Sequence, residues 1–238
     1  MTLNANSTTA KPAGKLYVVA TPIGNAGDIT TRAIETLAHA DVILCEEHRN
    51  GSRLLRSLGI AKPLLELNEH NEAERIQDVL LMLAQGQSLA LISDCGTPVF
   101  SDPGKKLLQL LYEMNIAVTP LPGASSLMAA LSVCPFDLEE FLFIGFLPVK
   151  IDQRRKKLSQ LKYADYPLVL MDTPYRMQRL LQEVQQSFGK KQNIFLACDL
   201  TMPEEHLYLG PVDEILTRIQ NRKAEFILIL DRPQKKPF

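Results

Sequence analysis

The chain has 238 residues, of which 46% are hydrophobic and 22% are charged, and its formal net charge is −1. This composition marks an ordinary soluble globular protein that can bury a proper core. A nearly neutral chain lacks the overall positive charge of many nucleic-acid-binding proteins, so any affinity for RNA has to come from a local patch.

The cysteines and the chain ends favour a cytoplasmic protein. The four cysteines are far apart and form no Cys-x-x-Cys pair, which argues against structural zinc and suits a reducing compartment. Each adjoins an apolar run and is expected to be a small core residue. Residues 1–14 are polar and predict a loose tail, not a signal peptide. No apolar run approaches the roughly 20 residues of a membrane helix, so we expect no membrane as partner. We expect no metal either, because the sequence lacks the spacing of zinc-binding motifs.

Short apolar runs alternate with helical patterns along the first half of the chain. The runs predict strands at 16–20, 42–45, 64–67, 89–92 and 116–118. Between them, helical spacing predicts helices at 29–38, 52–58 and 105–113, the first capped by Asp28, and a further helix that contains Ile76 and runs to Gly86. This alternation argues for a mainly parallel sheet covered by helices.

The segment 89–104, LALISDCGTPVFSDPG, is the one around which the chain is organised. Its apolar run predicts a buried strand, which the turn residues after Ser93 bring to an end. Gly96 gives the backbone angles closed to other residues, and Pro98 stiffens the exit. Loops at the carboxyl ends of strands are where open α/β sheets bind ligands. An ordinary turn between strand and helix is an equally good interpretation of these residues alone.

The second half alternates in the same way after a break at Pro120 to Gly123. Strands are expected at 141–146, 168–171, 194–197, 206–209 and 226–230, and helices at 125–131, 174–188 and 212–220. Residues 232–238 predict a second loose tail. The fold class is therefore α/β, with an N-terminal domain at 15–119 and a C-terminal domain at 120–238.

Two charged segments are candidates for function. Glu46, Glu47, His48 and Arg49 follow a predicted strand, and indicate either a site or a solvated turn. Five cations lie within eight residues of the second half, and phosphate contacts from them would give RNA a salt-dependent affinity. A solvated helix face is the alternative. These cations are Lys150, Arg154, Arg155, Lys156 and Lys157.

Common catalytic motifs are missing from the sequence. There is no GxxxxGK[ST] phosphate loop, no GxSxG nucleophile elbow and no HExxH zinc motif. Gly24 and Gly27 give only a partial likeness to a dinucleotide-binding loop. The residues alone therefore indicate a two-domain α/β protein with a ligand cleft and leave the chemistry open.

Six segments together resemble one family. They are LYVVATPIGNAGDIT, EEHR, NEHNE, ALISDCGTPVFSDPG, PLPGASS and FIGFLP. In this order they are similar to the bacterial small-subunit (16S) ribosomal RNA (cytidine-2′-O-)-methyltransferases of the tetrapyrrole methylase superfamily. The resemblance covers residues 15–230.

The resemblance implies two α/β domains with S-adenosylmethionine bound in the cleft between them, and a homodimer. It implies that small-subunit ribosomal RNA, or the 30S subunit, is the partner. It places the cofactor against four loops, whose residues here are Pro22, Ile23, Gly24, Asp94, Gly96, Thr97, Pro98, Ser125 and Ser126.

The expected reaction is methyl transfer to a ribose hydroxyl, a poor nucleophile at neutral pH that benefits from a base within hydrogen-bond reach. The candidates for this base are Glu47, Glu46 and His70. Arg49 is the candidate for orienting the acceptor or pairing with a phosphate. An ion pair between Glu47 and Arg49 with a purely structural role is the competing explanation.

The chain departs from the family in three segments. An AEDTRHT-like stretch is CEEHRNG here, an ESPHR-like stretch is DTPYR, and an RELTK-like stretch is CDLTM. Because these segments are expected to face the substrate, two alternatives stay open. The protein acts on another acceptor (another RNA, a small molecule or a tetrapyrrole), or it is a non-catalytic binding module.

Overall fold

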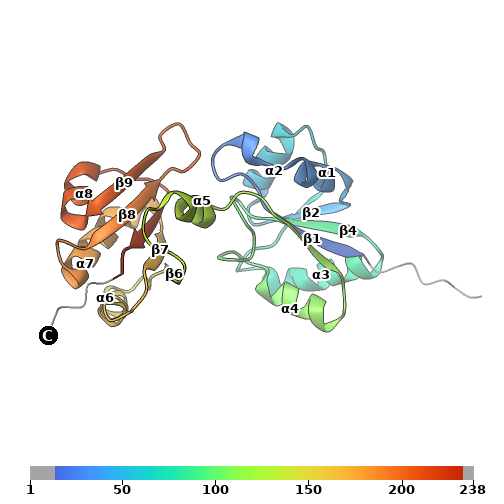
Figure 1. The fold of residues 1–238 in the computed structure, drawn as a ribbon. Helices are drawn as coiled ribbons and strands as arrows, with labels where there is room; N and C mark the ends of the chain where they lie inside the picture. Colours follow the sequence, from blue (N-terminus) through green and yellow to red (C-terminus); the bar gives the residue numbers. More distant parts are fainter. Residues whose placement is uncertain (1–13, 233–238) are drawn as a thin grey trace, which may run out of the picture. The chain divides into compact units, whose positions relative to one another are not determined.

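The structure, a computed structural model, describes residues 14–232 (Figure 1). The tails expected before residue 14 and after residue 232 lie outside the described residues. Gly14, expected in the first tail, is buried, and its N–H donates to the carbonyl of Leu83 at 2.7 Å. The chain divides into two compact units between Ser125 and Ser126. The expected boundary at Pro120 falls inside a strand of the first unit, because Pro120 continues an extended segment that pairs with Val18.

The first unit is built on a parallel sheet of five strands, as expected. The strands run in the order β3-β2-β4-β1-β5, and every described pair in this sheet is parallel. Their bounds are β1 Lys15–Val19, β2 Val42–Cys45, β3 Leu64–Glu66, β4 Ser88–Ile92 and β5 Val118–Leu121. The central strand β4 is buried from Leu89 to Ile92, which explains its uninterrupted apolar sequence.

Helices cover both faces of this sheet (Figure 1). On one face, α3 (Glu72–Ala84) and α4 (Lys105–Glu113) bury Ile76, Val79 and Leu107 against the strands. On the other face, α1 (Thr31–His39) and α2 (His48–Ser57) bury Leu37 and Leu55.

In the first unit, helices α1 and α2 begin at residues other than those expected. The cap of α1 is Thr30, whose hydroxyl accepts from the N–H of Ala33 at 3.1 Å, whereas Asp28 lies in a separate 3-10 turn, η1 (Ala26–Asp28). Helix α2 begins at His48 rather than at Ser52. Its first turn is stabilised from outside, because the carboxylate of Glu66 accepts from the N–H of His48 at 2.9 Å. The apolar pattern could not reveal this polar first turn.

The sheet of the second unit is mixed and mostly antiparallel, which corrects the expectation of a mainly parallel sheet. Its order is β6-β7-β10-β8-β9, and the last strand, β10, is antiparallel to both of its neighbours. The pair β8–β9 is also antiparallel, because these strands are joined by a loop at 199–205 without a helix. The strands are β6 Leu142–Phe146, β7 Leu168–Asp172, β8 Asn193–Cys198, β9 His206–Pro211 and β10 Phe226–Leu230.

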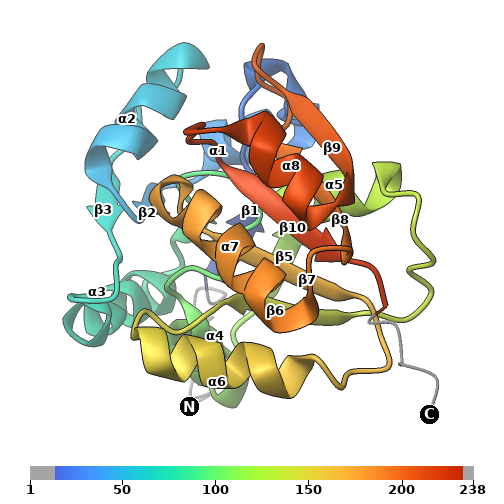
Figure 2. The same cartoon turned by 90° about the vertical axis from the view of Figure 1, so that its left-hand side faces the viewer.

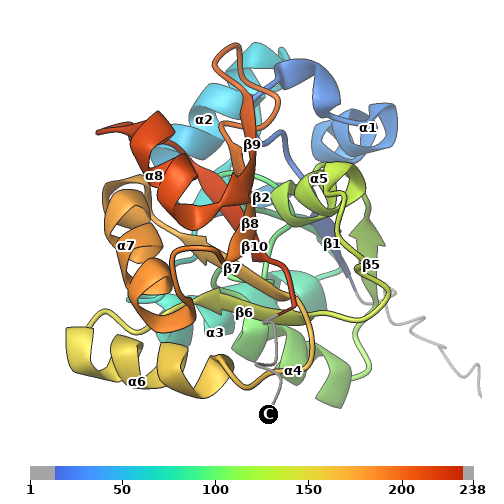
Figure 3. The same cartoon turned by 60° about the vertical axis from the view of Figure 1, so that its left-hand side comes forward.

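Helices again lie on both faces of the second sheet. Helices α7 (Met177–Phe188) and α8 (Val212–Ile219) cover one face, and α5 (Ser126–Val133) lies on the other (Figure 3). Helix α6 (Ile151–Leu161) runs beside α7 (Figure 2). A 3-10 turn, η2 (Pro174–Arg176), precedes α7, so the expected single helix from Pro174 is divided in two.

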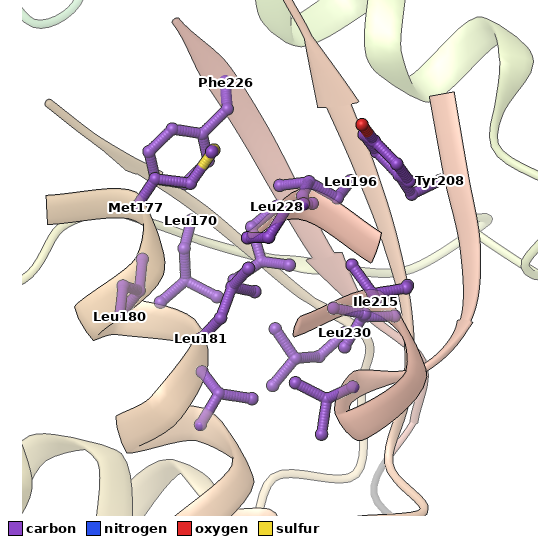
Figure 4. Close-up of a cluster of buried hydrophobic side chains, with 14 of the residues drawn as sticks. Leu170, Met177, Leu180, Leu181, Leu196, Tyr208, Ile215, Phe226, Leu228 and Leu230 are labelled. Carbon is purple, nitrogen blue, oxygen red and sulfur yellow. The ribbon is translucent and has the colours of Figure 1, made fainter. Parts of the chain in front are cut away.

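The main core of the second unit lies under α7 and α8 (Figure 4). Leu170, Leu196 and Leu228 project from three adjacent strands toward Leu181 and Ile215 of the two helices. Burial of each such side chain stabilises the fold by about 1.5–3 kcal/mol, so this layer holds the sheet in place.

The expected α/β fold class is confirmed. Among residues 14–232, no helix combines the length and the apolar character needed to span a bilayer.

Candidate functional site

The loops after β1 and β4 are joined at the carboxyl edge of the first sheet. Thr21 and Gly96 form an antiparallel bridge with two backbone hydrogen bonds, of 2.8 and 3.1 Å. Ser93 is buried beneath this bridge, and its hydroxyl donates to the carbonyl of Gly96 at 3.2 Å. The two loops expected to hold a cofactor therefore form one rigid surface.

Gly96 is required by this surface for two reasons. Its φ is +78°, which favours glycine, and a Cβ atom there would lie 3.2 Å from Cγ2 of Ile23. The next residue, Thr97, donates from its hydroxyl to the carbonyl of Ala124 at 3.2 Å, which ties in the loop after β5. Three loops that are far apart in the sequence thus meet around Gly96.

The structure places most of the expected cofactor residues in this one region of the first unit. Ser126 is the exception, because it opens α5 and belongs to the second unit. The residues that lie on the joined loops are Pro22, Ile23, Gly24, Asp94, Gly96, Thr97, Pro98 and Ser125.

A hydrogen-bonded group of polar side chains lies beside these loops, at the end of β2. The amide of Asn50 donates to Oε2 of Glu47 at 3.1 Å and to Oδ2 of Asp94 at 2.6 Å. The N–H of Glu47 donates to Oδ1 of Asp94 at 3.3 Å. Sequence reasoning missed Asn50, although its spacing of three residues from Glu47 would have indicated it had α2 been expected to begin at His48.

Glu46 is the carboxylate with the most altered acidity in this group. Its pKa is raised to about 7, mainly by partial burial and then by the nearby negative charges of Asp102, Asp94, Glu47 and Glu69. Burial, followed by the charge of Asp94, also raises the pKa of Asp102. A carboxyl group that titrates near neutral pH can accept a proton under physiological conditions.

The other two candidates from this edge are exposed. Arg49 lies in the first turn of α2, and no described ion pair joins it to Glu47, so the structural ion pair weighed from the sequence is absent from residues 14–232. His70 lies in the turn after β3, where its N–H donates to Oδ1 of Asn68 at 3.1 Å. Both side chains are available to a ligand at this edge.

The basic segment of α6 is divided by the fold, which corrects one expectation. Arg154 does not face a ligand, because it is 2% exposed and pairs with Glu183 through Nε–Oε2 (2.5 Å) and Nη2–Oε1 (2.9 Å). Its Nη1 donates to the carbonyls of Pro148 and Val149. This hydrogen bonding with Arg154 lowers the pKa of Glu183. The four cations that remain exposed are Lys150, Arg155, Lys156 and Lys157.

The expectation that every cysteine is a core residue is wrong for Cys95. Cys45 and Cys198 are buried, and burial raises the pKa of each thiol to about 12, whereas Cys95 is exposed in the loop after β4. Within the described range 14–232, no three His, Cys, Asp or Glu side chains are grouped so that they could hold a metal ion.

Comparison with known protein families identifies the family of this chain. A profile described as Tetrapyrrole (Corrin/Porphyrin) Methylases matches residues 15–216, which include the whole first sheet and every strand of the second except β10. The chain belongs to the tetrapyrrole methylase family. It is a methyltransferase by that membership, as the resemblance of its six segments implied.

Within this family, the chain is similar to proteins named ribosomal RNA small subunit methyltransferase I. The one from Haemophilus influenzae is 39% identical over 93% of this chain and 80% of its own length. The one from Synechocystis is 37% identical over 94% of this chain and 82% of its own length. Among solved structures, a uroporphyrin-III-C-methyltransferase from Thermus thermophilus has a TM-score of 0.63 at 21% identity, and covers 92% of this chain and 94% of its own. This structural similarity concerns the fold.

Proposed function

We propose that the protein transfers the methyl group of S-adenosylmethionine to the ribose 2′-hydroxyl of a cytidine in small-subunit ribosomal RNA. The observation that carries the proposal is the identity of 37–39% to proteins named ribosomal RNA small subunit methyltransferase I, over about nine-tenths of the chain. These relatives are matched through both units, so the likeness is not limited to the cofactor loops.

The joined loops of the first unit fit the cofactor. Because Gly96 has no side chain, Ile23 packs closely against its backbone, which holds the loops after β1 and β4 together as one surface for a ligand. Asp94 uses one lone pair on each carboxylate oxygen for Glu47 and Asn50, so each oxygen can still accept from a ligand hydroxyl or amine. When bound, S-adenosylmethionine supplies a methyl group on a sulfonium cation. The residues proposed to hold it are the cofactor residues given above, with Ser126 added from the second unit.

Substituting Gly96 tests this assignment. Gly96→Ala adds a Cβ at 3.2 Å from Ile23, so we expect weaker cofactor binding as well as a loss of stability of about 1–2 kcal/mol from the positive φ. Gly59→Ala is a matched control, because Gly59 has φ +67° and nothing lies within 4 Å of its added Cβ. Calorimetric titration with S-adenosylmethionine measures both variants, and equal affinities would remove Gly96 from the site.

Glu46 is our choice for the general base. A glutamate that acts as the base must lie within hydrogen-bond reach of the 2′-hydroxyl and must be in its carboxylate form. It accepts the proton most effectively when its pKa lies near the working pH. The pKa of Glu46 is about 7. Glu47 is instead held by Asn50, which fits a role in positioning. We propose that Arg49 and His70 orient the acceptor, since both are exposed at the same edge of the sheet.

We propose that the exposed cations of α6 contact RNA phosphates. Each phosphate contact releases counterions, so it strengthens binding and makes it depend on salt. The double variant with Lys156→Glu and Lys157→Glu should have a lower affinity for RNA. In this variant the slope of log affinity against log salt should be smaller in magnitude by about one to two. Filter binding at several salt concentrations measures this slope. An unchanged slope would show that the segment is only a solvated helix face.

We also propose that two copies associate and act in the cytoplasm. Leu207 and Leu209 support the association of two copies, because their side chains are 40% and 51% exposed on the edge strand β9. Both pair with residues of β8 whose side chains lie in the apolar layer beneath α5. Analytical ultracentrifugation of the wild type and of Leu209→Lys measures the association.

The decisive experiment compares modified nucleosides in small-subunit ribosomal RNA from cells with and without the protein, by mass spectrometry. Loss of one 2′-O-methylated cytidine species would support both the reaction and the acceptor, and mapping of fragments would locate the nucleotide. An unchanged profile in cells without the protein would overturn the proposal.

A further inference from the structure

Three arginines form a stripe along α2 in the first unit. Arg49, Arg53 and Arg56, here called the arginine stripe, recur at intervals of four and three residues, which places them on one face of the helix. All three are exposed, whereas Gly51 and Leu55 on the opposite face are buried. Sequence reasoning missed the stripe, because the expected helix began at Ser52 and left Arg49 outside it.

The positive charge of the stripe is not neutralised within the described part of the chain. Helix α2 contains no Asp or Glu, and none of the described ion pairs includes Arg49, Arg53 or Arg56. A solvated helix face usually mixes both signs, because like charges four residues apart destabilise a helix. Arg49 also lies in the first turn, where the helix dipole repels a cation. The stripe therefore costs the protein some stability, which indicates an anionic partner.

The stripe begins at the candidate site. Arg49 lies in the first turn of α2, from which Asn50 donates to Oδ2 of Asp94 at 2.6 Å. From there the stripe runs away from the site for about 10 Å, the rise of seven helical residues. Glu46, in contrast, has other carboxylates around it. Because carboxylates repel a phosphate and arginines attract one, the charges favour an RNA strand with its backbone over α2 and an uncharged ribose at Glu46.

The residue type and its repetition fit the backbone of a nucleic acid. A guanidinium group is planar and pairs with two phosphate oxygens at once, so arginine is well suited to phosphate. A row of three such groups matches successive phosphates of one strand better than a single small anion. Helix α2 packs on β2 and β3 at the edge of the first sheet, and the stripe lies on its exposed face (Figure 2).

We propose that the arginine stripe is a docking surface for the phosphate backbone of the substrate RNA beside the acceptor nucleotide. Arg49 contacts the phosphate nearest to the acceptor ribose, and Arg53 and Arg56 contact phosphates further along the strand. The inference rests on the proposed function and extends it, because it adds an RNA surface in the first unit to the cations of α6 in the second.

The test is a double variant of the full-length protein, Arg53→Gln with Arg56→Gln, which keeps Arg49 and retains a good helix former at both positions. The control, Lys190→Gln with Lys191→Gln, removes two exposed cations from the loop between α7 and β8 and changes the net charge equally. A second double variant, with Lys in place of both arginines, keeps the charge without the planar fork. The substrates are 30S subunits from cells that lack the protein, and the RNA extracted from them.

We expect the glutamine variant to raise KM for the extracted RNA roughly 10-fold or more. Its kcat should stay within about twofold of the wild type, since the lost contacts bind ground state and transition state alike. In filter binding, the slope of log affinity against log salt should become smaller in magnitude by about 1.4–1.8. The lysine variant should keep the wild-type slope with only part of the affinity.

Two further measurements exclude an effect on the fold or on the cofactor. Affinity for S-adenosylmethionine, measured by calorimetry, should match the wild type. The melting temperature should stay equal or rise, because the substitutions relieve repulsion within the stripe. A marked fall in the melting temperature of both double variants would overturn the inference, because the arginines would then support the fold.

The outcomes separate this inference from the proposed function. If the wild type methylates neither substrate, the proposed function fails, and the inference with it. If the wild type is active and the glutamine variant equals the Lys190 and Lys191 control in KM and in salt slope, only the inference is overturned. A loss with 30S subunits that is absent with extracted RNA would also overturn it, because the stripe would then contact a ribosomal protein.

Discussion

Glu46→Gln should reduce kcat roughly 10²- to 10⁴-fold while the affinity for S-adenosylmethionine stays close to that of the wild type. Glutamine keeps the shape of the side chain but cannot take the proton of the 2′-hydroxyl. Single-turnover methyl transfer at saturating RNA measures the effect, and calorimetry measures the cofactor affinity. A variant with wild-type kcat would exclude Glu46 as the base.

The pH profile gives an independent test of the same assignment. The active form is the carboxylate, and the pKa of Glu46 is about 7, so the rate should rise between about pH 6 and 8 and fall as the group becomes protonated. Glu69→Gln removes one of the negative charges that raise this pKa. The rising limb of its profile should therefore move to lower pH, with the maximal rate preserved.

Arg154→Ala should destabilise the second unit by about 3–5 kcal/mol, because it leaves the carboxylate of Glu183 buried without its partner. Urea unfolding followed by circular dichroism measures the free energy. The neighbouring Arg155→Ala provides the control: Arg155 is exposed, and we expect a change within about 0.5 kcal/mol. Similar effects in both variants would mean that the pair contributes little.

Acid should weaken the same interaction. Hydrogen bonding with Arg154 lowers the pKa of Glu183 in the folded protein. The stabilisation is therefore present above the pKa of Glu183 in the unfolded chain, and it is lost as the pH falls through the lower value of the folded state. Wild type and Arg154→Ala should accordingly become closer in stability as the solution is acidified.

The first sheet could be predicted from the sequence because its information is local. Apolar runs such as Leu89–Ile92 are typical of strands buried on both faces, and alternation with helices implies parallel pairing. The loop around Gly96 was also predictable, since glycine and proline mark turns. The hydrogen bonds that join this loop to Thr21 were not, because they connect residues that are far apart in the chain.

Long-range pairing explains the errors as well. Arg154 resembles its basic neighbours in the sequence, and nothing local indicates that Glu183 of α7 neutralises it. The direction of β10 depends on which strands it lies between, and its apolar sequence suits either direction. Local patterns predict elements and turns, whereas partners and strand order require the folded chain.

The position of β10 has a consequence for synthesis of the protein. The last strand in the sequence is the central strand of the second sheet, between β7 and β8. A growing chain can complete the first sheet once Leu121 has left the ribosome, but β7 and β8 stay without their shared neighbour until Leu230 has emerged. Apolar strand edges are thus exposed until translation ends, and this is the period in which the nascent chain is most prone to aggregate or to need a chaperone.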